Sequence, residues 1–315
     1  MIFANIGVKV LNVALVGYGY WGRILKKYID QDRDMHLIKI CYPSAVIDDV
    51  FTNNIQDVIE DGTIEAAFVA TPIPTHYAIV KTLLEGNKHV FCEKPLARQV
   101  TQAQELTRIA CEKNRVLYTN YIYLESRGIQ KIEELLPAVG NIQYVEAQIR
   151  QFGNFYKDEN VYEILASHFI AVMLFLFPTQ QFTIQYHDLV RNSSGQVEVG
   201  KITLNGIKMK VEIVASLKSV SKERTLCVTG SSGVLRFDML SDKTVLLRTF
   251  KEQEGFKSCI ENEISYYYNE NDNLTFSLQH FKESVRGARM SNTELSVAVT
   301  GFLGQHSEGG QCGTV

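Results

Sequence analysis

The chain has 315 residues, of which 45% are hydrophobic and 21% are charged, and its formal net charge is −3. This length exceeds what one hydrophobic core usually accommodates, so two domains are expected. The small negative charge gives no electrostatic reason to expect nucleic acid or an anionic membrane as a partner.

Six cysteines are spread along the chain without a C-x-x-C pair, which is typical of reduced thiols in a cytoplasmic protein. The first residues lack a basic stretch, so we expect no signal peptide. The most apolar run, residues 169–178, is too short for a membrane span, which needs about 20 residues. We therefore predict a cytoplasmic protein without a membrane partner.

The first apolar run, residues 11–16, predicts a buried strand of a parallel sheet. It runs into Gly17-Tyr-Gly-Tyr-Trp-Gly22, which fills the G-x-G-x-x-G spacing, and residues 21–29 then follow an amphipathic helical pattern. Gly17 allows a tight turn, Gly19 lets a pyrophosphate approach the backbone, and Gly22 lets helix and strand pack closely. Because a helix N-terminus also attracts phosphates, we predict a dinucleotide site. A glycine-rich turn without a ligand is the alternative.

Strands alternate with helices along the first 120 residues. Strand patterns follow at residues 37–41, 66–70, 89–92 and 116–119, and helical patterns at 55–59, 75–84 and 101–113. Two prolines in residues 71–74 argue against a helix there. This alternation predicts an α/β fold, with a Rossmann doubly wound parallel sheet over residues 1–120.

The pattern changes after residue 120. Residues 140–152 alternate apolar and polar side chains, as a half-buried antiparallel strand does, and a helical pattern interrupts at 161–177. Further strand patterns lie at 182–186, 197–204, 207–217, 225–229, 234–238 and 244–249. We predict that residues 121–315 form an α+β domain with a large, open, mostly antiparallel sheet. Helices at 278–286 and 294–303 are expected to pack back on the first domain.

Three further stretches accompany the glycine-rich turn: Ala70-Thr-Pro-Ile-Pro-Thr-His-Tyr77, Cys92-Glu-Lys-Pro-Leu-Ala97 and Ser167-His168. In order and spacing, the four stretches resemble the glucose–fructose oxidoreductase/inositol dehydrogenase (Gfo/Idh/MocA) family of NAD(P)-dependent sugar oxidoreductases, over most of the chain. The form of the glycine-rich turn looks most like the branch that acts on nucleotide-linked sugars.

The resemblance implies an activity and a cofactor. A hydride would pass between NAD(H) or NADP(H) and a hydroxyl or keto carbon of a sugar or nucleotide-linked sugar. Lys94 corresponds to the family's lysine beside the nicotinamide, where an ammonium group stabilises a developing alkoxide. His168 corresponds to the central-helix histidine that moves the hydroxyl proton. A core histidine is the alternative for His168, because its neighbours are apolar.

The resemblance also implies which residues contact the ligands. For the cofactor they are Gly17, Tyr18, Gly19, Tyr20, Trp21, Gly22, Tyr42, Ser44, Thr71, Pro72, His76, Glu93 and Lys94. For the substrate they are Lys94, Tyr121, Tyr123, Glu125, Arg127 and His168, since such folds bind ligands at the carboxyl ends of strands. A helix-start surface position is the alternative for His76, and packing at the domain junction is the alternative for Tyr121 and Tyr123.

Two positions depart from the family's pattern. The family usually places Asp four residues before the central histidine, where this chain has Ile164, and Glu163 would point about 100° away on an α-helix. NAD-preferring folds place an acidic residue after the second strand to bind the ribose 2′-hydroxyl, where this chain has Tyr42-Pro-Ser44, with Asp48 further on. The choice between NAD and NADP therefore stays open.

Two alternatives to a sugar dehydrogenase follow. Ile164 and Phe169 favour a catalytically silent member that binds NAD(P) or a sugar, and relatives of this fold also reduce imines or biliverdin.

We expect a homodimer or homotetramer through the C-terminal sheet. We expect no metal, because the histidines and cysteines lack metal-ligand spacing.

Overall fold

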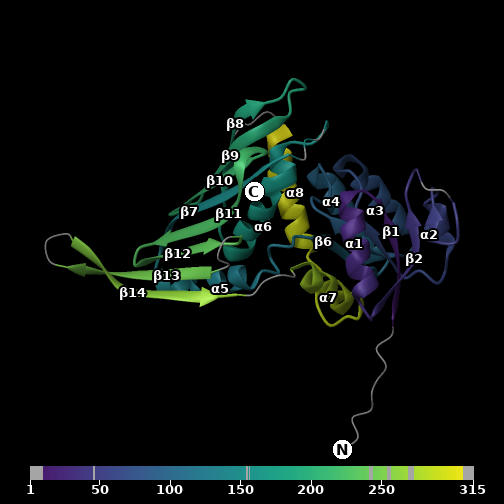
Figure 1. Cartoon of the computed structure of the whole chain (residues 1–315), viewed down its shortest axis with the longest axis horizontal. Helices are drawn as coiled ribbons and strands as arrows, with labels where there is room; N and C mark the ends of the chain where they lie inside the picture. Colours follow the sequence, from purple (N-terminus) through teal and green to yellow (C-terminus); the bar gives the residue numbers. More distant parts are fainter. Residues whose placement is uncertain are drawn as a thin grey trace, which may run out of the picture. The chain divides into compact units, whose positions relative to one another are not determined.

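The computed structural model describes residues 10–44, 47–153, 155, 157–240, 244–253, 257–268 and 273–307. It divides into two compact units (Figure 1). The first unit comprises Met1–Asn120 and Leu274–Val297, and the second comprises Tyr121–Asn273 and Ala298–Val315. Helix α7 (Asn273–Val285) and the start of α8 (Thr293–Ser307) thus join the N-terminal residues in one unit. Of the helices that the structure describes, none is long and apolar enough to cross a membrane.

The first unit is built on a six-stranded sheet in the order β3-β2-β1-β4-β5-β6, with all adjacent pairs parallel. Its strands are β1 (Leu11–Val16), β2 (Met35–Cys41), β3 (Phe51–Thr52), β4 (Ala66–Val69), β5 (His89–Glu93) and β6 (Leu117–Asn120). The connecting helices are α1 (Tyr20–Gln31), α2 (Gln56–Glu60), α3 (His76–Glu85) and α4 (Val100–Glu112). This strand order is that of dinucleotide-binding folds, so the predicted doubly wound parallel sheet is confirmed.

Helix α7 completes the core of the first unit. The ring of Phe281 on α7 packs on Phe68 of β4 at 5.4 Å and on Phe91 of β5 at 5.6 Å, measured between centroids. Next to it, the Asn292 side chain bonds the backbone of Thr119 on β6 through its oxygen at 2.9 Å and its amide at 2.7 Å. Helix α7 and the residues that follow it therefore pack on the N-terminal sheet.

An ion pair with little solvent exposure ties α7 to the turn after α1. Lys282 Nζ lies 2.7 and 2.6 Å from the two carboxylate oxygens of Asp32, and the two side chains are only 10% and 17% exposed. Removing one partner of a buried pair leaves the other charge unpaired. We expect Lys282→Met to lower the free energy of unfolding by about 2 kcal/mol in a urea titration. Asp32→Asn should add little in the Lys282→Met background; equal urea midpoints for parent and Lys282→Met would contradict the prediction.

The second unit is built on an eight-stranded sheet in the order β14-β13-β12-β11-β7-β10-β9-β8. Its strands are β7 (Ile142–Phe152), β8 (Thr183–Arg191), β9 (Val197–Asn205), β10 (Lys210–Ser216), β11 (Lys218–Gly230), β12 (Gly233–Asp238), β13 (Thr244–Gln253) and β14 (Lys257–Tyr267). Strands β7 and β10 pair in parallel, and the other adjacent pairs are antiparallel. The predicted large, mostly antiparallel sheet is therefore confirmed.

Helices α5 (Arg127–Leu135) and α6 (Ser167–Leu176) lie on one face of this sheet (Figure 1). The alternation of β7 follows from this arrangement, because Val145, Ala147 and Ile149 are buried and the residues between them are half-buried. Gly128 allows α5 to approach closely, since a Cβ there would clash with the ring of Phe237 on β12.

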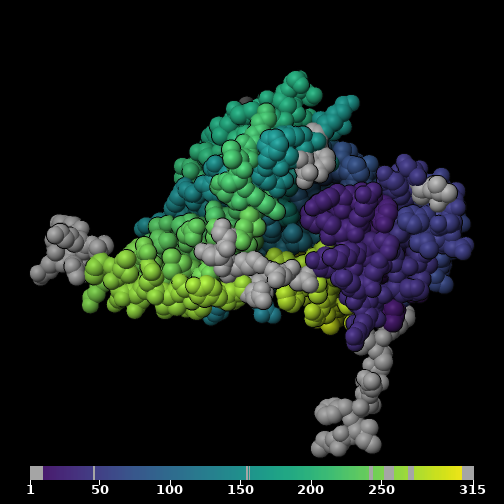
Figure 2. Space-filling view, in the orientation of Figure 1, coloured from purple at the N-terminus to yellow at the C-terminus, as the bar shows by residue number. Residues whose placement is uncertain are grey.

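Several elements differ from the sequence-based expectation. Strand β14 was not predicted, because its sequence mixes charged and apolar residues and its side chains are largely exposed; Ile260, Ile264 and Tyr267 are 55%, 45% and 79% exposed. It forms the surface next to β13, in yellow-green in Figure 2. Backbone pairing with β13, rather than burial of its side chains, stabilises this edge strand. The short strand β3 and helix α5 were also missed.

The expected absence of a helix at residues 71–74 is wrong in one detail. A 3₁₀ helix, η1 (Ile73–Thr75), begins after Pro72 and carries Pro74 in its first turn. A proline is tolerated there because the first N–H groups of a helix have no intrahelical partner.

Candidate functional site

The glycine-rich turn between β1 and α1 has the geometry that its spacing predicts. Gly17 has a φ of +97°, and its N–H donates to the carbonyl oxygen of Cys41 at 2.8 Å. A Cβ at Gly22 would clash with the carbonyl oxygen of Gly17, whereas a Cβ at Gly19 would meet no heavy atom within 4 Å. The turn and the helix are thus packed together at Gly17 and Gly22, and the space above Gly19 is open to a ligand.

Helix α1 presents free backbone donors at this turn. Gly19 is its N-cap, and in the part of the chain that the structure describes no side chain caps the helix. The first N–H groups of an uncapped helix bind anions such as a pyrophosphate. Tyr20 and Trp21 flank the turn, 69% and 37% exposed, and Tyr18 packs edge-on against Phe51 at 5.4 Å.

Closing this turn with a side chain should weaken dinucleotide binding. We expect Gly22→Ala to raise the Kd for NADPH and NADH by about tenfold, because the added methyl group pushes the helix N-terminus away from the strand. Titration of the reduced nicotinamide fluorescence measures this Kd. Gly62→Ala is the matched control, since a Cβ at Gly62 meets nothing within 4 Å. Equal affinities for the two variants would overturn the prediction.

Directly after β2, none of the described residues 42–44 carries a carboxylate for a ribose 2′-hydroxyl. Tyr42 is half-buried, and its N–H donates to the carbonyl of Thr52 at 2.8 Å, while Ser44 is exposed. Asp48 is engaged in its own turn, because Oδ1 accepts from the N–H groups of Val50 at 2.8 Å and Phe51 at 2.6 Å. These bonds lower the pKa of Asp48. Asp48 therefore serves first to close the turn before β3.

His76 links the loop after β4 to the turn after β5. Its Nδ1 lies 2.8 Å from the carbonyl oxygen of Pro95 and its Nε2 lies 2.8 Å from that of Thr71. The ring is 1% exposed, and burial lowers its pKa. A neutral imidazole carries one N–H and so donates to one of the two carbonyls. His76 is thus buried rather than at the surface, and its direct contact with a cofactor stays a prediction.

The rest of this loop is closed by local bonds. The Thr75 hydroxyl lies 2.8 Å from the Thr71 hydroxyl and donates to the carbonyl of Pro72 at 2.7 Å. Thr71 and Pro72 therefore sit in a fixed turn at the carboxyl end of β4, next to the end of β1.

Glu93 and Lys94 follow at the carboxyl end of β5. The Glu93 carboxylate is 8% exposed and accepts from the amide of Asn120 at 2.8 Å, and Asn120 accepts in turn from the Ser277 hydroxyl at 2.8 Å. Burial raises the pKa of Glu93. Lys94 is half-buried. Glu93 is therefore bonded to Asn120 of β6, which Ser277 of α7 bonds in turn, and this chain of hydrogen bonds restrains the residue that precedes Lys94.

In the second unit, the predicted helix 161–177 is not a continuous α-helix. It opens with a π-helical turn at Tyr162–Ala166 and continues as α6. Asn160 caps this turn: its side-chain oxygen accepts from the N–H groups of Tyr162 at 2.9 Å and Glu163 at 3.1 Å. The Glu163 carboxylate accepts in return from the N–H of Asn160 at 3.1 Å, so the two residues form a reciprocal capping box.

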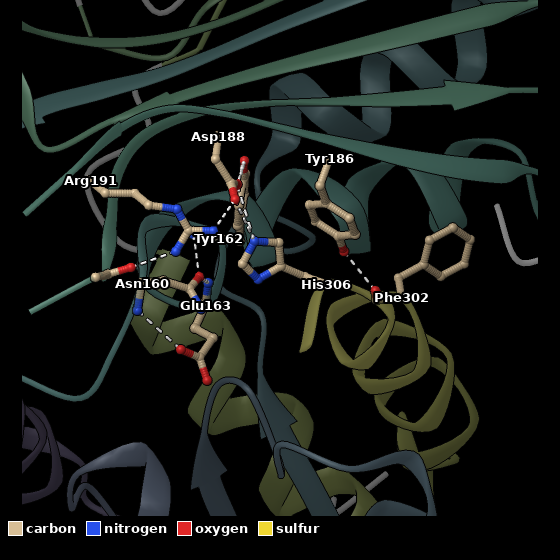
Figure 3. Close-up of polar contacts among 9 residues, drawn as sticks. Asn160, Tyr162, Glu163, Tyr186, Asp188, Arg191, Phe302 and His306 are labelled. Atoms are coloured by element: carbon tan, nitrogen blue, oxygen red, sulfur yellow. Dashed lines mark hydrogen bonds and ion pairs between the residues drawn. The ribbon is translucent and has the colours of Figure 1, made fainter. Parts of the chain in front are cut away.

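A polar cluster holds the other side of the π-turn (Figure 3). The hydroxyl of Tyr162 donates to Asp188 on β8 at 2.8 Å, and the same carboxylate bonds Arg191 and lies 3.1 Å from Nε2 of His306 on α8. The Tyr162 ring packs closely against Gly200 of β9, where a Cβ atom would clash with the hydroxyl. The start of the helix is therefore fixed to both β8 and α8.

The π-turn places one more residue in the turn before His168 than an α-helix has. The N–H of Ser167 is directed at the carbonyl of Tyr162, five residues earlier. A π-turn has i→i+5 bonds in place of the i→i+4 bonds of an α-helix. The expectation that Glu163 points about 100° away from the His168 side assumed an α-helix, so it does not carry over to this turn, and the direction of Glu163 relative to His168 stays a prediction.

His168 is 8% exposed at the start of α6, and its ring stacks on that of Tyr123 with centroids 4.5 Å apart. The hydroxyl of Tyr123 accepts from Nε of Arg224 on β11 at 2.7 Å. Tyr121 and Glu125, which flank Tyr123, are buried, and Arg127 is the exposed first residue of α5.

The predicted site residues thus fall into two groups. The cofactor residues of the first unit lie at the carboxyl ends of neighbouring strands, and Tyr123 and His168 meet in the second unit. Arg224 and the role of Glu163 were missed. The Asn160-x-x-Glu163 spacing is a capping-box signal that sequence alone shows, whereas nothing near Arg224 in the sequence indicates Tyr123. Among the described residues, no group of three or more His, Cys, Asp or Glu is placed to hold a metal ion.

Comparison with known proteins gives sequence matches to the N-terminal part of the chain and structural matches to its whole fold. Residues 11–121 match the model of an oxidoreductase family with an NAD-binding Rossmann fold, GFO_IDH_MocA. Biliverdin reductase A of Mus musculus is 29% identical over 121 residues, which are 37% of this chain and 41% of that protein. The matched segments span less than half the length of such curated relatives.

Two solved structures share the fold over nearly the whole chain. GenD2 from gentamicin A biosynthesis, in complex with NAD, has a TM-score of 0.83 at 18% identity, covering 98% of this chain and 97% of its own. KijD10, a 3-ketoreductase from Actinomadura kijaniata in complex with TDP-benzene and NADP, has a TM-score of 0.81 at 14% identity, covering 94% and 96%.

Proposed function

We propose that the chain is a member of the Gfo/Idh/MocA oxidoreductase family, whose model matches residues 11–121, and that it catalyses a specific reaction. It transfers a hydride between the nicotinamide of NAD(H) or NADP(H) and a hydroxyl or keto carbon of a sugar or nucleotide-linked sugar. The observation that carries the proposal is the glycine turn, which is open at Gly19 and closed at Gly17 and Gly22.

Two residues do the remaining chemistry in this proposal. Lys94, at the end of β5, places an ammonium group against the reacting oxygen and stabilises the negative charge that develops there. His168 accepts the hydroxyl proton when the alcohol is oxidised and returns it when the ketone is reduced. When bound, the nicotinamide accepts or donates the hydride. These roles rest on the resemblance of the motifs and on the placement of Lys94 after β5.

The substrate class rests on the structural neighbours. One of them is a 3-ketoreductase in complex with TDP-benzene and NADP, and the other comes from gentamicin A biosynthesis. A reductase of a non-sugar substrate is the second candidate, and the similarity to biliverdin reductase A favours it. A catalytically silent binder is the third, favoured by Ile164 and Phe169 next to His168.

The test is the change of NAD(P)H absorbance with a panel of nucleotide sugars and free sugars, run in both directions, with biliverdin in parallel. Turnover of a sugar or nucleotide sugar supports the proposal. Turnover of biliverdin alone replaces it with the second candidate. Tight binding of NAD(P)H without turnover of any substrate supports the silent binder.

We also propose a homo-oligomer that forms through the face of the eight-stranded sheet opposite α5 and α6. The middle of that face carries half-buried polar side chains that bond one another: Tyr144 and Lys201 bond the carboxylate of Glu212 at 3.0 and 3.2 Å. Such an ordered polar network suits a wet interface between subunits. A monomeric mass in light scattering would contradict this proposal.

A further inference from the structure

His168 takes part in a stack of two rings in the second unit. The rings of His168 and Tyr123 are 4.5 Å apart between centroids and 23° from parallel. Phe169 meets the same tyrosine ring edge-on, at 5.8 Å and 67°. An imidazole rotates about its last torsion unless a neighbour restrains it, and a flat ring against its face is such a restraint.

The tyrosine of this stack is itself anchored. Its hydroxyl accepts from Nε of Arg224 at 2.7 Å, and burial raises its pKa, so the phenol stays protonated. It comes from the segment between β6 and α5, which has no regular secondary structure of its own. The bond to Arg224 therefore joins this connecting segment to β11.

Arg224 is held more firmly than most arginines, because it is only 5% exposed. Its NH1 donates to the carbonyl oxygens of Arg150 at 2.6 Å and Glu223 at 2.7 Å, and its NH2 donates to Oε1 of Gln151 at 2.5 Å. All four acceptors, including the Tyr123 hydroxyl, are neutral oxygens, so the guanidinium group is positioned by hydrogen bonds rather than by a carboxylate. These bonds span β7 and β11, the two central strands that pair at this point.

We propose that Tyr123 and Arg224 are positioning residues for His168: Arg224 fixes the ring of Tyr123, and this ring holds the imidazole in its reactive orientation. The inference rests on the proposed function, since it gives His168 the acid–base role. It replaces the direct substrate contact that the sequence suggests for Tyr123, whose hydroxyl and one ring face are already engaged. A catalytic group that is misplaced by about 1 Å loses on the order of 10²-fold in rate.

The test separates the ring from the hydroxyl. Tyr123→Leu removes the stack, and we expect kcat to fall by about 10²-fold while the Kd for the cofactor is unchanged. Tyr123→Phe keeps the ring and should lower kcat only a few-fold. Arg224→Met should fall between the two, and Arg224→Lys, which retains one donor, should recover part of the loss. Tyr267→Leu, the same change at an exposed ring of β14, is the control and should match the parent.

The double variant decides whether Tyr123 acts through His168. In a His168→Asn background, Tyr123→Leu should cost nothing further, because there is no imidazole left to orient. A further loss of about 10²-fold in that background would show a direct contact with substrate and overturn the proposal. If Tyr123→Leu no longer unfolds cooperatively, kcat is compared in Tyr123→Phe and Arg224→Met instead. Parental kcat in both of these variants would also overturn the proposal.

An NMR measurement tests the positioning of His168 independently of the proposed enzymatic activity. The ring current of Tyr123 should shift the carbon-bound imidazole protons of His168 upfield in the NMR spectrum. Tyr123→Leu should remove this shift and Tyr123→Phe should keep it. If the parent turns over no substrate but the shift behaves in this way, the proposed function fails while the positioning of His168 stands. If the shift is absent from the parent, the positioning fails whatever the activity.

Discussion

Replacing Lys94 by Ala should lower kcat by about 10³-fold and leave the Kd for NAD(P)H within about twofold of the parent. The loss follows from removing the only charge that the proposed mechanism places against the developing alkoxide, and losing one such donor costs about 10²- to 10³-fold in other enzymes. The affinity is kept because the glycine turn and the N-terminus of α1 carry the phosphate contacts.

Turnover of the best substrate from the panel, together with a fluorescence titration of the reduced cofactor, measures both quantities. Lys113→Ala, at an exposed position after α4, is the matched control and should behave as the parent. Lys94→Arg keeps the charge and should retain part of the rate. A Lys94→Ala protein with parental kcat would exclude Lys94 from the reaction.

His168→Asn should lower kcat by about 10²- to 10³-fold, since a positioned acid–base group contributes about 10²- to 10⁴-fold. Glu163 adds a second expectation, because it lies in the π-turn that leads into His168. A carboxylate near an imidazole stabilises the imidazolium that forms when the proton is taken up. If Glu163 has this role, Glu163→Gln should lower kcat about tenfold.

Glutamine preserves the capping box, so Glu163→Gln changes the charge and not the helix start. Glu163→Ala loses both and should also unfold at a lower temperature, since a lost capping contact costs about 1 kcal/mol. Parental kcat in Glu163→Gln, with reduced stability in Glu163→Ala, would show that Glu163 is a capping residue alone. His280→Asn provides the control for a histidine change outside the second unit.

The first unit could be predicted closely because its signals are local. The bounds of β1 follow from an apolar run that contains a single polar residue, Asn12. The turn after it follows from three glycines, two of which the structure shows to be sterically required. The positions of Thr71 and Lys94 follow from the same rule, since the ends of adjacent parallel strands share one edge of the sheet.

The second unit was less predictable because its site depends on distant pairings. Arg224 reaches Tyr123, which is 101 residues earlier in the chain, through the pairing of β7 with β11. The π-turn adds one residue to a helix without a change in hydrophobic pattern, so the relation of Glu163 to His168 could not be read from periodicity. Strand β14 forms by pairing with β13 and carries few buried side chains.

The contribution of α7 to the N-terminal sheet has a consequence for synthesis on the ribosome. The strands of the Rossmann sheet are complete once residue 120 has emerged, but the rings of Phe68 and Phe91 gain their Phe281 partner only some 160 residues later. At a translation rate of about 5–20 residues per second, the apolar face of the nascent sheet stays uncovered for roughly 10–30 s. The unit that binds the dinucleotide is thus the first to begin folding, and it can finish only after most of the second unit has been translated.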